Sequence, residues 1–160
     1  MFADVSRSTK LYDTAGDAIA HKAIEACVNL FKERAAAHGG RTIKTIGDEV
    51  MAEFPSGPQA MQAAVEMQHG ITAMPAPVEC VQLGARIGFH FGPMVECDGD
   101  VLGDTINLAA RLSGLASKGQ IITSEDTVAG LTPIHRTDCR HLYSIPVKGK
   151  EQEIGLCEVL

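Results

Sequence analysis

The sequence contains no tryptophan, and aromatic residues make up only 4% of its 160 positions. Basic residues are also scarce, because 14 Lys and Arg side chains face 20 Asp and Glu side chains, for a formal net charge of -6. A protein that binds the phosphate backbone of a nucleic acid needs a concentrated basic surface. We therefore expect no nucleic-acid polymer as a partner, although a single nucleotide can still bind through metal ions.

The five cysteines are odd in number and scattered without CxxC pairs, so neither a disulfide framework nor a zinc site is indicated. The six histidines show no paired metal-ligand spacing, apart from a loose pairing of His141 with Cys139. No run approaches the roughly 18 consecutive apolar residues of a membrane span, and no signal segment opens the chain. We therefore expect a cytoplasmic domain with no membrane contact of its own.

A chain of 17.0 kDa is large enough for one domain with a real hydrophobic core. Its 45% hydrophobic and 21% charged residues are typical of a globular α/β protein. Residues 1–4 resemble the tail of an apolar strand. We interpret residues 1–160 as a single domain excised from a longer protein, with its first strand truncated.

Hydrophobic periodicity predicts three main helices, over residues 17–38, about 60–71 and about 105–116. Gly39 and Gly40 are expected to stop the first of them. Short β-prone runs predict strands over residues 41–46, 49–54, 81–91, 120–123, 142–147 and 153–159. This order predicts an α/β (α+β) fold of the ferredoxin-like or palm type, with a mostly antiparallel sheet flanked by helices.

Two aspartates are candidates for metal binding. Asp4 is expected at the end of the first strand and Asp48 at the tip of a hairpin, where carboxylates from adjacent strands can converge. Paired carboxylates suit Mg²⁺ held together with substrate phosphates. The alternative is structural: Asp4 would cap a helix that starts near residues 6–9, and Asp48 would be a turn residue.

Asn107 and Arg111 lie four residues apart on a predicted helix and therefore share one face. An amide and a guanidinium on one face can address one substrate. A solvated helix face is the alternative.

Three segments resemble signatures of the class III adenylyl and guanylyl cyclases, and they occur in that family's order and spacing. They are residues 2–9 (FADVSRST), 44–48 (KTIGD) and 103–111 (GDTINLAAR). The similarity continues to residues 147–150 (VKGK) and so covers essentially the whole chain. The sequence is identified on this basis as a member of the family.

The resemblance implies that Asp4 and Asp48 hold two divalent ions, Mg²⁺ or Mn²⁺, over the triphosphate of the substrate. It also implies that backbone amides of Val5, Ser6 and Ser8 receive phosphate oxygens. The family commonly has Gly-Phe where this chain has Arg7-Ser8. Arg7 then either contacts phosphate or faces solvent.

By the same resemblance, Asn107 orients the ribose and Arg111 stabilises negative charge on the α-phosphate. A preorganised donor of this kind contributes roughly 3–4 kcal/mol. Lys148 corresponds to a late lysine that reaches the triphosphate, although it could equally be a charged turn residue.

Lys44 and Asp100 match the family positions that read the base. Adenine offers an acceptor at N1 and a donor amino group, so a cationic donor beside a carboxylate selects it. Guanylyl cyclases usually have Glu and Cys there. Asp98 and Asp104 lie close to Asp100 in the sequence, but the spacing to Asn107 selects Asp100.

The resemblance implies sites shared between two subunits, with metal ligands from one and the base, ribose and phosphate contacts from the other. This chain has both sets, so a symmetric homodimer would complete two equivalent composite sites. Small rotations within the dimer would misalign the reacting groups, which an upstream sensor or regulatory domain could exploit.

The expected activity is therefore conversion of ATP to cyclic AMP and pyrophosphate. Three alternatives remain: a guanylate cyclase, a non-catalytic cyclase-like module that binds nucleotide or a partner, and a diguanylate cyclase with a related palm fold. The last lacks a role for Asn107 and Arg111.

Overall fold

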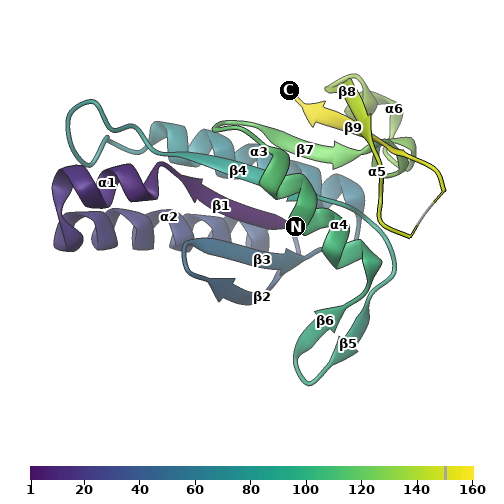
Figure 1. Cartoon of the computed structure of the whole chain (residues 1–160), viewed down its shortest axis with the longest axis horizontal. Helices are drawn as coiled ribbons and strands as arrows, with labels where there is room; N and C mark the ends of the chain where they lie inside the picture. Colours follow the sequence, from purple (N-terminus) through teal and green to yellow (C-terminus); the bar gives the residue numbers. More distant parts are fainter. Residues whose placement is uncertain (150) are drawn as a thin grey trace.

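The computed structural model describes residues 1–149 and 151–160. Its helices are α1 (Ser8–Ala15), α2 (Asp17–Ala37), α3 (Gly57–Ala73), α4 (Asp104–Leu115), α5 (Glu125–Ala129) and α6 (Pro133–Arg136). Its strands are β1 (Phe2–Ser6), β2 (Arg41–Ile46), β3 (Glu49–Glu53), β4 (Gly84–Phe89), β5 (Val95–Cys97), β6 (Asp100–Leu102), β7 (Ile121–Ser124), β8 (Cys139–Ile145) and β9 (Ile154–Val159). Figure 1 shows their arrangement.

The main sheet has seven strands among the described residues, in the order β2-β3-β1-β4-β7-β9-β8. All neighbouring pairs are antiparallel except β4 and β7, which run parallel. The expected fold class, a mostly antiparallel sheet flanked by helices, is confirmed.

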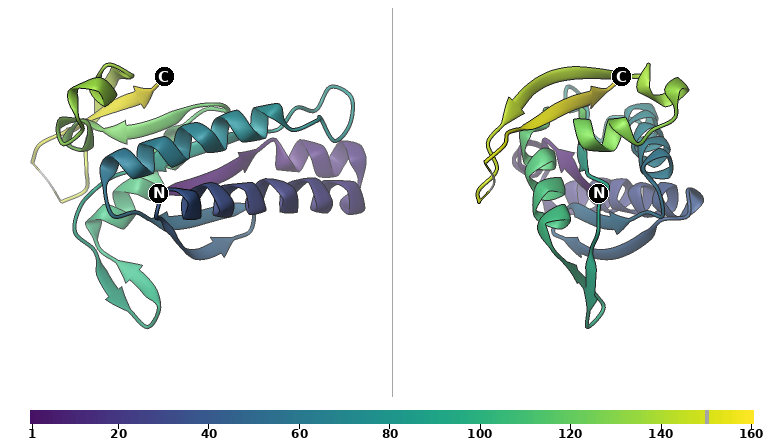
Figure 2. Two further views of the ribbon diagram at one scale, coloured as in Figure 1. Left: turned by 180° about the vertical axis from the view of Figure 1, so that it is seen from behind. Right: turned by 90° about the vertical axis from the view of Figure 1, so that its right-hand side faces the viewer.

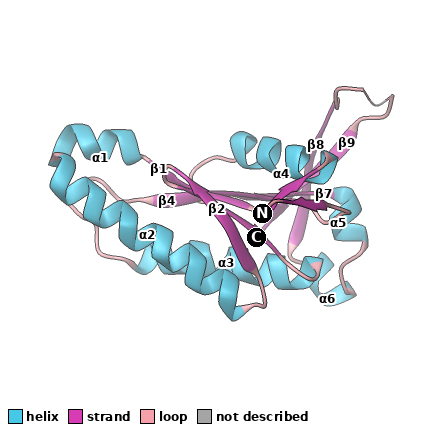
Figure 3. Ribbon diagram, turned by 90° about the horizontal axis from the view of Figure 1, so that it is seen from below, coloured by secondary structure: helices cyan, strands magenta, loops and turns pink. Residues whose placement is uncertain are grey.

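Helices cover both faces of the central strands. Figure 3 shows α2 and α3 on one face of the sheet and α4 on the other. All five residues of β1 are buried as a result, whereas the edge strand β2 is largely exposed. This explains why residues 2–6 lack the polar and apolar alternation of a half-buried strand.

The predicted helix over residues 17–38 is confirmed as α2. The expected inner face is buried at Ala20, Ile24, Phe31 and Ala35. The helix ends where predicted, because Gly39 adopts a positive φ of 75° that few other residues accept without strain.

Several boundaries differ from the prediction. Strand β8 covers Cys139–Ile145 rather than residues 142–147. Helix α3 begins at Gly57 rather than near residue 60, because the Ser56 side chain accepts a hydrogen bond from the Gln59 backbone N–H at 3.4 Å. Strand β4 is shorter than residues 81–91, since Val81 forms only an isolated bridge with Val78.

A small hairpin of β5 and β6 was not predicted. It projects away from the main sheet in both views of Figure 2. Asp98 and Gly99 form its turn with φ values of 50° and 78°. An Asp-Gly pair is a strong hairpin signal because both turn residues need positive φ.

No helix among the described residues is long and apolar enough to span a membrane.

Candidate active site

Asp4 lies at the centre of β1, the third of five residues, and not at the end of the strand as expected. Its direct cross-strand partners are Glu49 on β3 and Arg86 on β4. Directly paired residues project from the same face of a sheet, so the three side chains gather there. Asp48 is in the turn between β2 and β3, immediately before Glu49.

The carboxyl group of Asp4 is buried and forms an ion pair with the Arg86 guanidinium. Burial raises the pKa of Asp4, the neighbouring Asp48 raises it further, and Arg86 opposes both effects. Burial also raises the pKa of Glu49, as do the charges of Asp4 and Asp48. Two carboxylates therefore converge as predicted, in a place where negative charge is only partly compensated.

An open depression beside Asp4 and Asp48 is lined by the turn from β1 into α1, including Val5, Ser6 and Ser8. The three residues expected to offer backbone amides to phosphate are thus brought to the two aspartates. The alternative role of Asp4 as a helix cap is wrong, because Arg7 occupies the N-cap position of α1.

Arg7 has a left-handed backbone conformation, with φ 66° and ψ 18°. Glycine adopts this conformation without strain, which gives a physical reason for the glycine common at this position in the family. The Arg7 side chain is exposed on the rim of the depression.

Sequence reasoning missed three basic residues near the depression. Arg86 lines it, and its buried Nε has no hydrogen-bond partner among the described residues. Lys10 also lines it. The third is Lys118, whose pKa is lowered first by burial and then by the charges of Arg7 and Lys10. Arg86 had a sequence signal, because it is a charged residue inside the apolar run predicted as a strand over residues 81–91.

Lys44 on β2 and Asp100 on β6 are brought together, although 56 residues separate them in sequence. The Lys44 Nζ lies 2.7 Å from Asp100 Oδ2, and both side chains are partly exposed. This ion pair, with the backbone N–H of Val101, lowers the pKa of Asp100. The pair therefore offers a cationic donor and an ionised acceptor side by side.

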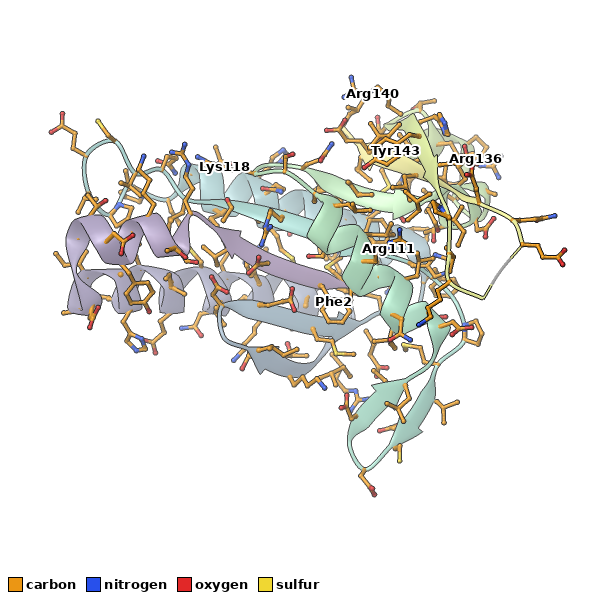
Figure 4. All side chains as sticks on the ribbon, viewed as in Figure 1. Phe2, Arg111, Lys118, Arg136, Arg140 and Tyr143 are labelled. Atoms are coloured by element: carbon orange, nitrogen blue, oxygen red, sulfur yellow. The ribbon has the colours of Figure 1, made fainter. Side chains whose placement is uncertain are left out.

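Asn107 and Arg111 both lie on α4, as predicted. Arg111 Nη1 donates a hydrogen bond to the backbone oxygen of Pro146 at 2.6 Å. In Figure 4, Arg111 lies beside α4, and its hydrogen bond is to the segment that follows β8. Pro146 follows β8 and leads to Lys148, which is exposed in the turn. Arg111 thus contacts the segment that contains Lys148.

The expected site residues form separate groups in one chain. Asp4, Asp48 and the 5–8 turn surround one depression, and its lining includes none of Lys44, Asp100, Asn107, Arg111 or Lys148.

The Asp4 and Asp48 pair fits divalent cations. Both groups are hard oxygen ligands, which Mg²⁺ and Mn²⁺ prefer. Burial is the main cause that raises the pKa of Asp4, and the nearby Asp48 adds to it, so a bound cation would offset both effects.

Comparison with known proteins identifies the family of this chain. Residues 1–157 match the family described as the adenylate and guanylate cyclase catalytic domain. The chain belongs to this family, whose members catalyse nucleotide cyclisation, and its resemblance to class III cyclases is confirmed.

An adenylate cyclase of Streptomyces coelicolor is 33% identical over 125 residues, which cover 76% of this chain and 30% of that protein. A solved adenylate cyclase structure from Trypanosoma brucei, in its monomeric state, has a TM-score of 0.85 at 21% identity, covering 99% of this chain and 87% of the other. A second solved structure is the catalytic core of a rhodopsin-guanylyl cyclase with converted specificity, in complex with ATPαS. It has a TM-score of 0.81 at 22% identity and covers 99% of this chain and 92% of that chain. The chain spans less than a third of the length of these curated relatives and of others that it matches.

Proposed function

We propose that this domain is an adenylate cyclase that converts ATP to 3′,5′-cyclic AMP and pyrophosphate. The observation that carries the choice of ATP is the ion pair of Lys44 and Asp100 at 2.7 Å. The Lys44 ammonium can donate to adenine N1, while the ionised Asp100 carboxylate can accept from the adenine amino group. Guanine presents the reversed pattern and would leave both groups mispaired.

Asp4 and Asp48 would hold two divalent cations. When bound, these ions would lower the pKa of the ribose 3′-hydroxyl and screen the charge of the triphosphate. Backbone amides of Val5, Ser6 and Ser8 would receive phosphate oxygens at the start of α1. Arg86 would remain beside Asp4, where its guanidinium adds positive charge next to the phosphates.

Asn107 would orient the ribose so that its 3′-oxygen faces the α-phosphorus in line with the leaving pyrophosphate. Arg111 would stabilise the charge that develops on the α-phosphate oxygens. This requires Arg111 to leave the Pro146 carbonyl or to share its donors, since the guanidinium has five N–H groups. Lys148 would approach the triphosphate from the same segment.

The two groups of residues would meet between two copies of the chain. In a symmetric homodimer, each composite site would combine Asp4 and Asp48 of one subunit with Lys44, Asp100, Asn107, Arg111 and Lys148 of the other. The separation of the groups within one chain supports this arrangement. In a complete protein, an upstream regulatory domain would act by changing the alignment of the subunits.

Two alternatives have different consequences. A guanylate cyclase would need a base site that tolerates the reversed hydrogen-bond pattern, against the charges of Lys44 and Asp100. A non-catalytic module would bind nucleotide without turnover, although all the residues expected for turnover are present in the sequence.

The decisive test is to incubate the purified domain at rising protein concentration with Mg²⁺ or Mn²⁺ and with ATP or GTP, and to quantify cyclic nucleotides by mass spectrometry. We expect cyclic AMP from ATP, specific activity that increases with protein concentration, and loss of product in Asp48→Ala. Preferential cyclic GMP would overturn the assignment of Lys44 and Asp100. Nucleotide binding without product at any concentration would favour the non-catalytic module.

A further inference from the structure

A second cluster of potential metal ligands lies away from the depression at Asp4. Within residues 1–149 and 151–160, Glu125, His141 and Cys157 each offer one ligand atom, and these atoms lie within 4.8 Å of one another. They come from three elements: Glu125 begins α5, His141 is on β8 and Cys157 is on β9. None of the three has a role in the proposed cyclase reaction.

The fold produces this cluster through strand register and close packing. His141 and Cys157 are direct partners in the antiparallel β8 and β9 pair, so their side chains share a face. Gly155 lies two residues before Cys157 on that face, and a Cβ there would approach the Glu125 Oε2 to 2.1 Å. The missing side chain leaves the space that the Glu125 carboxylate occupies.

The ligand atoms lie near, but not at, the spacing of a tetrahedral coordination sphere. The His141 Nδ1 lies 2.5 Å from Glu125 Oε1, and the Cys157 Sγ completes the group within 4.8 Å. Ligand atoms around Zn²⁺, bound at about 2.0–2.3 Å, are about 3.5 Å apart in tetrahedral geometry. Side-chain rotations that move these ligand atoms by roughly 1 Å would therefore produce a coordination sphere.

The three ligand atoms favour a transition-metal ion over Mg²⁺. One thiolate, one imidazole and one carboxylate match the ligands that Zn²⁺ and Co²⁺ accept, whereas Mg²⁺ prefers oxygen ligands alone. The Glu125 and His141 side chains are 53% and 54% exposed, so a cation can enter from solvent. Asp126, Glu151 and Glu153 line the adjoining depression and add negative potential that attracts cations.

We propose that Glu125, His141 and Cys157 form a binding site for a transition-metal ion of the zinc class, distinct from the Mg²⁺ or Mn²⁺ pair at Asp4 and Asp48. The fourth position is open to water. A bound ion links α5 to both strands of the β8 and β9 hairpin. Strand β8 continues to Pro146, whose carbonyl accepts the Arg111 hydrogen bond, so the ion also restrains the segment that includes Lys148.

Without a cation the cluster is a close contact between His141 Nδ1 and Glu125 Oε1 beside the Cys157 thiol. Burial raises the pKa of the Cys157 thiol to about 11, with smaller effects from Glu125 and Cys139. A metal has to displace the thiol proton, so binding is expected to strengthen as pH rises.

The test titrates the domain with Co²⁺ in the presence of saturating Mg²⁺ and records the thiolate-to-cobalt charge-transfer absorption and the tetrahedral d–d bands. Exposed Cys80 and Cys97 are first replaced by Ser to remove adventitious thiols. Zn²⁺ affinity is then measured by displacement of Co²⁺, and thermal unfolding is followed with and without Zn²⁺. Test variants are Glu125→Gln, His141→Asn and Cys157→Ser; controls are Cys139→Ser and Asp48→Asn.

We expect a charge-transfer band at one equivalent of Co²⁺, a higher Tm with Zn²⁺, and at least about tenfold weaker binding in Glu125→Gln and His141→Asn. These two side chains are exposed, so circular dichroism should show intact folding even if Cys157→Ser is unstable. The controls should retain the band. Absence of the band in the folded domain, or loss of binding in Asp48→Asn but not in His141→Asn, would overturn the proposal. Neither result depends on cyclase activity, so the test stands apart from the proposed function.

Discussion

At the scale of single residues, the site depends on backbone conformation and burial as much as on residue type. Arg7 starts α1 from a left-handed conformation at φ 66°, next to the residues expected to bind phosphate. A non-glycine residue there is strained by roughly 1–2 kcal/mol. The turn is therefore sensitive to the shape of the side chain at position 7.

Replacing Arg7 with Val should destabilise the domain by about 1–2 kcal/mol relative to Arg7→Asn, because a β-branched residue tolerates positive φ poorly and Asn tolerates it well. Both variants remove the same charge, so their difference isolates the backbone effect. Urea unfolding followed by circular dichroism measures it. Equal stability of the two variants would contradict the left-handed conformation.

Cys27 on α2 provides a prediction for alkaline pH. Burial raises the pKa of its thiol from 9.0 to about 11, so the folded state holds the proton more tightly than the unfolded state. As pH rises from about 9 to about 11, the unfolded chain loses this proton first, and the free energy of unfolding should fall. Cys27→Ala should show a shallower decline across this interval, measured by urea unfolding at each pH. An unchanged slope would mean that the thiol is not buried.

At the scale of elements, the position of α4 is set by its contact with β4. A Cβ at Gly88 would lie 2.1 Å from the backbone N of Ser113 and 2.6 Å from the carbonyl carbon of Leu112. The helix packs directly against this glycine, with backbone on both sides of the contact. Asn107 and Arg111 lie on this helix, so the contact also positions the residues expected to act on the ribose and the α-phosphate.

Gly88→Ala should therefore destabilise the domain by about 1–3 kcal/mol and reduce cyclase activity more than nucleotide binding, because α4 has to move. Gly114→Ala is the matched control, since a Cβ there meets nothing within 4 Å. That substitution lies inside α4 and should stabilise it by about 0.5–1 kcal/mol. Thermal unfolding and cyclic AMP assays compare the two variants. If Gly88→Ala changes neither stability nor activity, α4 does not pack directly against Gly88.

At the scale of the whole molecule, we propose that the reaction uses two copies of the chain. The depression at Asp4 and Asp48 is built from β1, α1, β4 and the β2–β3 turn. The other expected groups are the Lys44 and Asp100 pair and the contact of Arg111 with the segment after β8. A composite site would follow from this separation.

Mixing two inactive variants tests that arrangement. Asp48→Ala and Arg111→Ala should each be inactive, but a mixed dimer retains one intact site. Random exchange of subunits gives half mixed dimers with one working site each, so activity should recover to about a quarter of the unmodified level. A mixture that stays inactive after subunit exchange would contradict the shared site.

Many structural features of this protein could be predicted from short stretches of its sequence. Several features depend only on residues within a few positions of one another. They are the buried face of α2, its end at Gly39, the hairpin at Asp48, and the shared helix face of Asn107 and Arg111. The three signature segments likewise lie in short stretches. Local periodicity and turn chemistry are enough for such features, because the interactions that produce them are themselves local. Even the missed β5 and β6 hairpin had a local signal in Asp98-Gly99.

Other features depend on which strands become neighbours. The sequence by itself does not indicate that Arg86 faces Asp4, that Arg111 reaches the Pro146 carbonyl, or that Gly155 makes room for Glu125. The grouping of Glu125, His141 and Cys157 is of the same kind, because the register of β8 and β9 places two of its members together. These contacts join residues far apart in the chain, and only the packing of the sheet and its helices brings them within reach of one another.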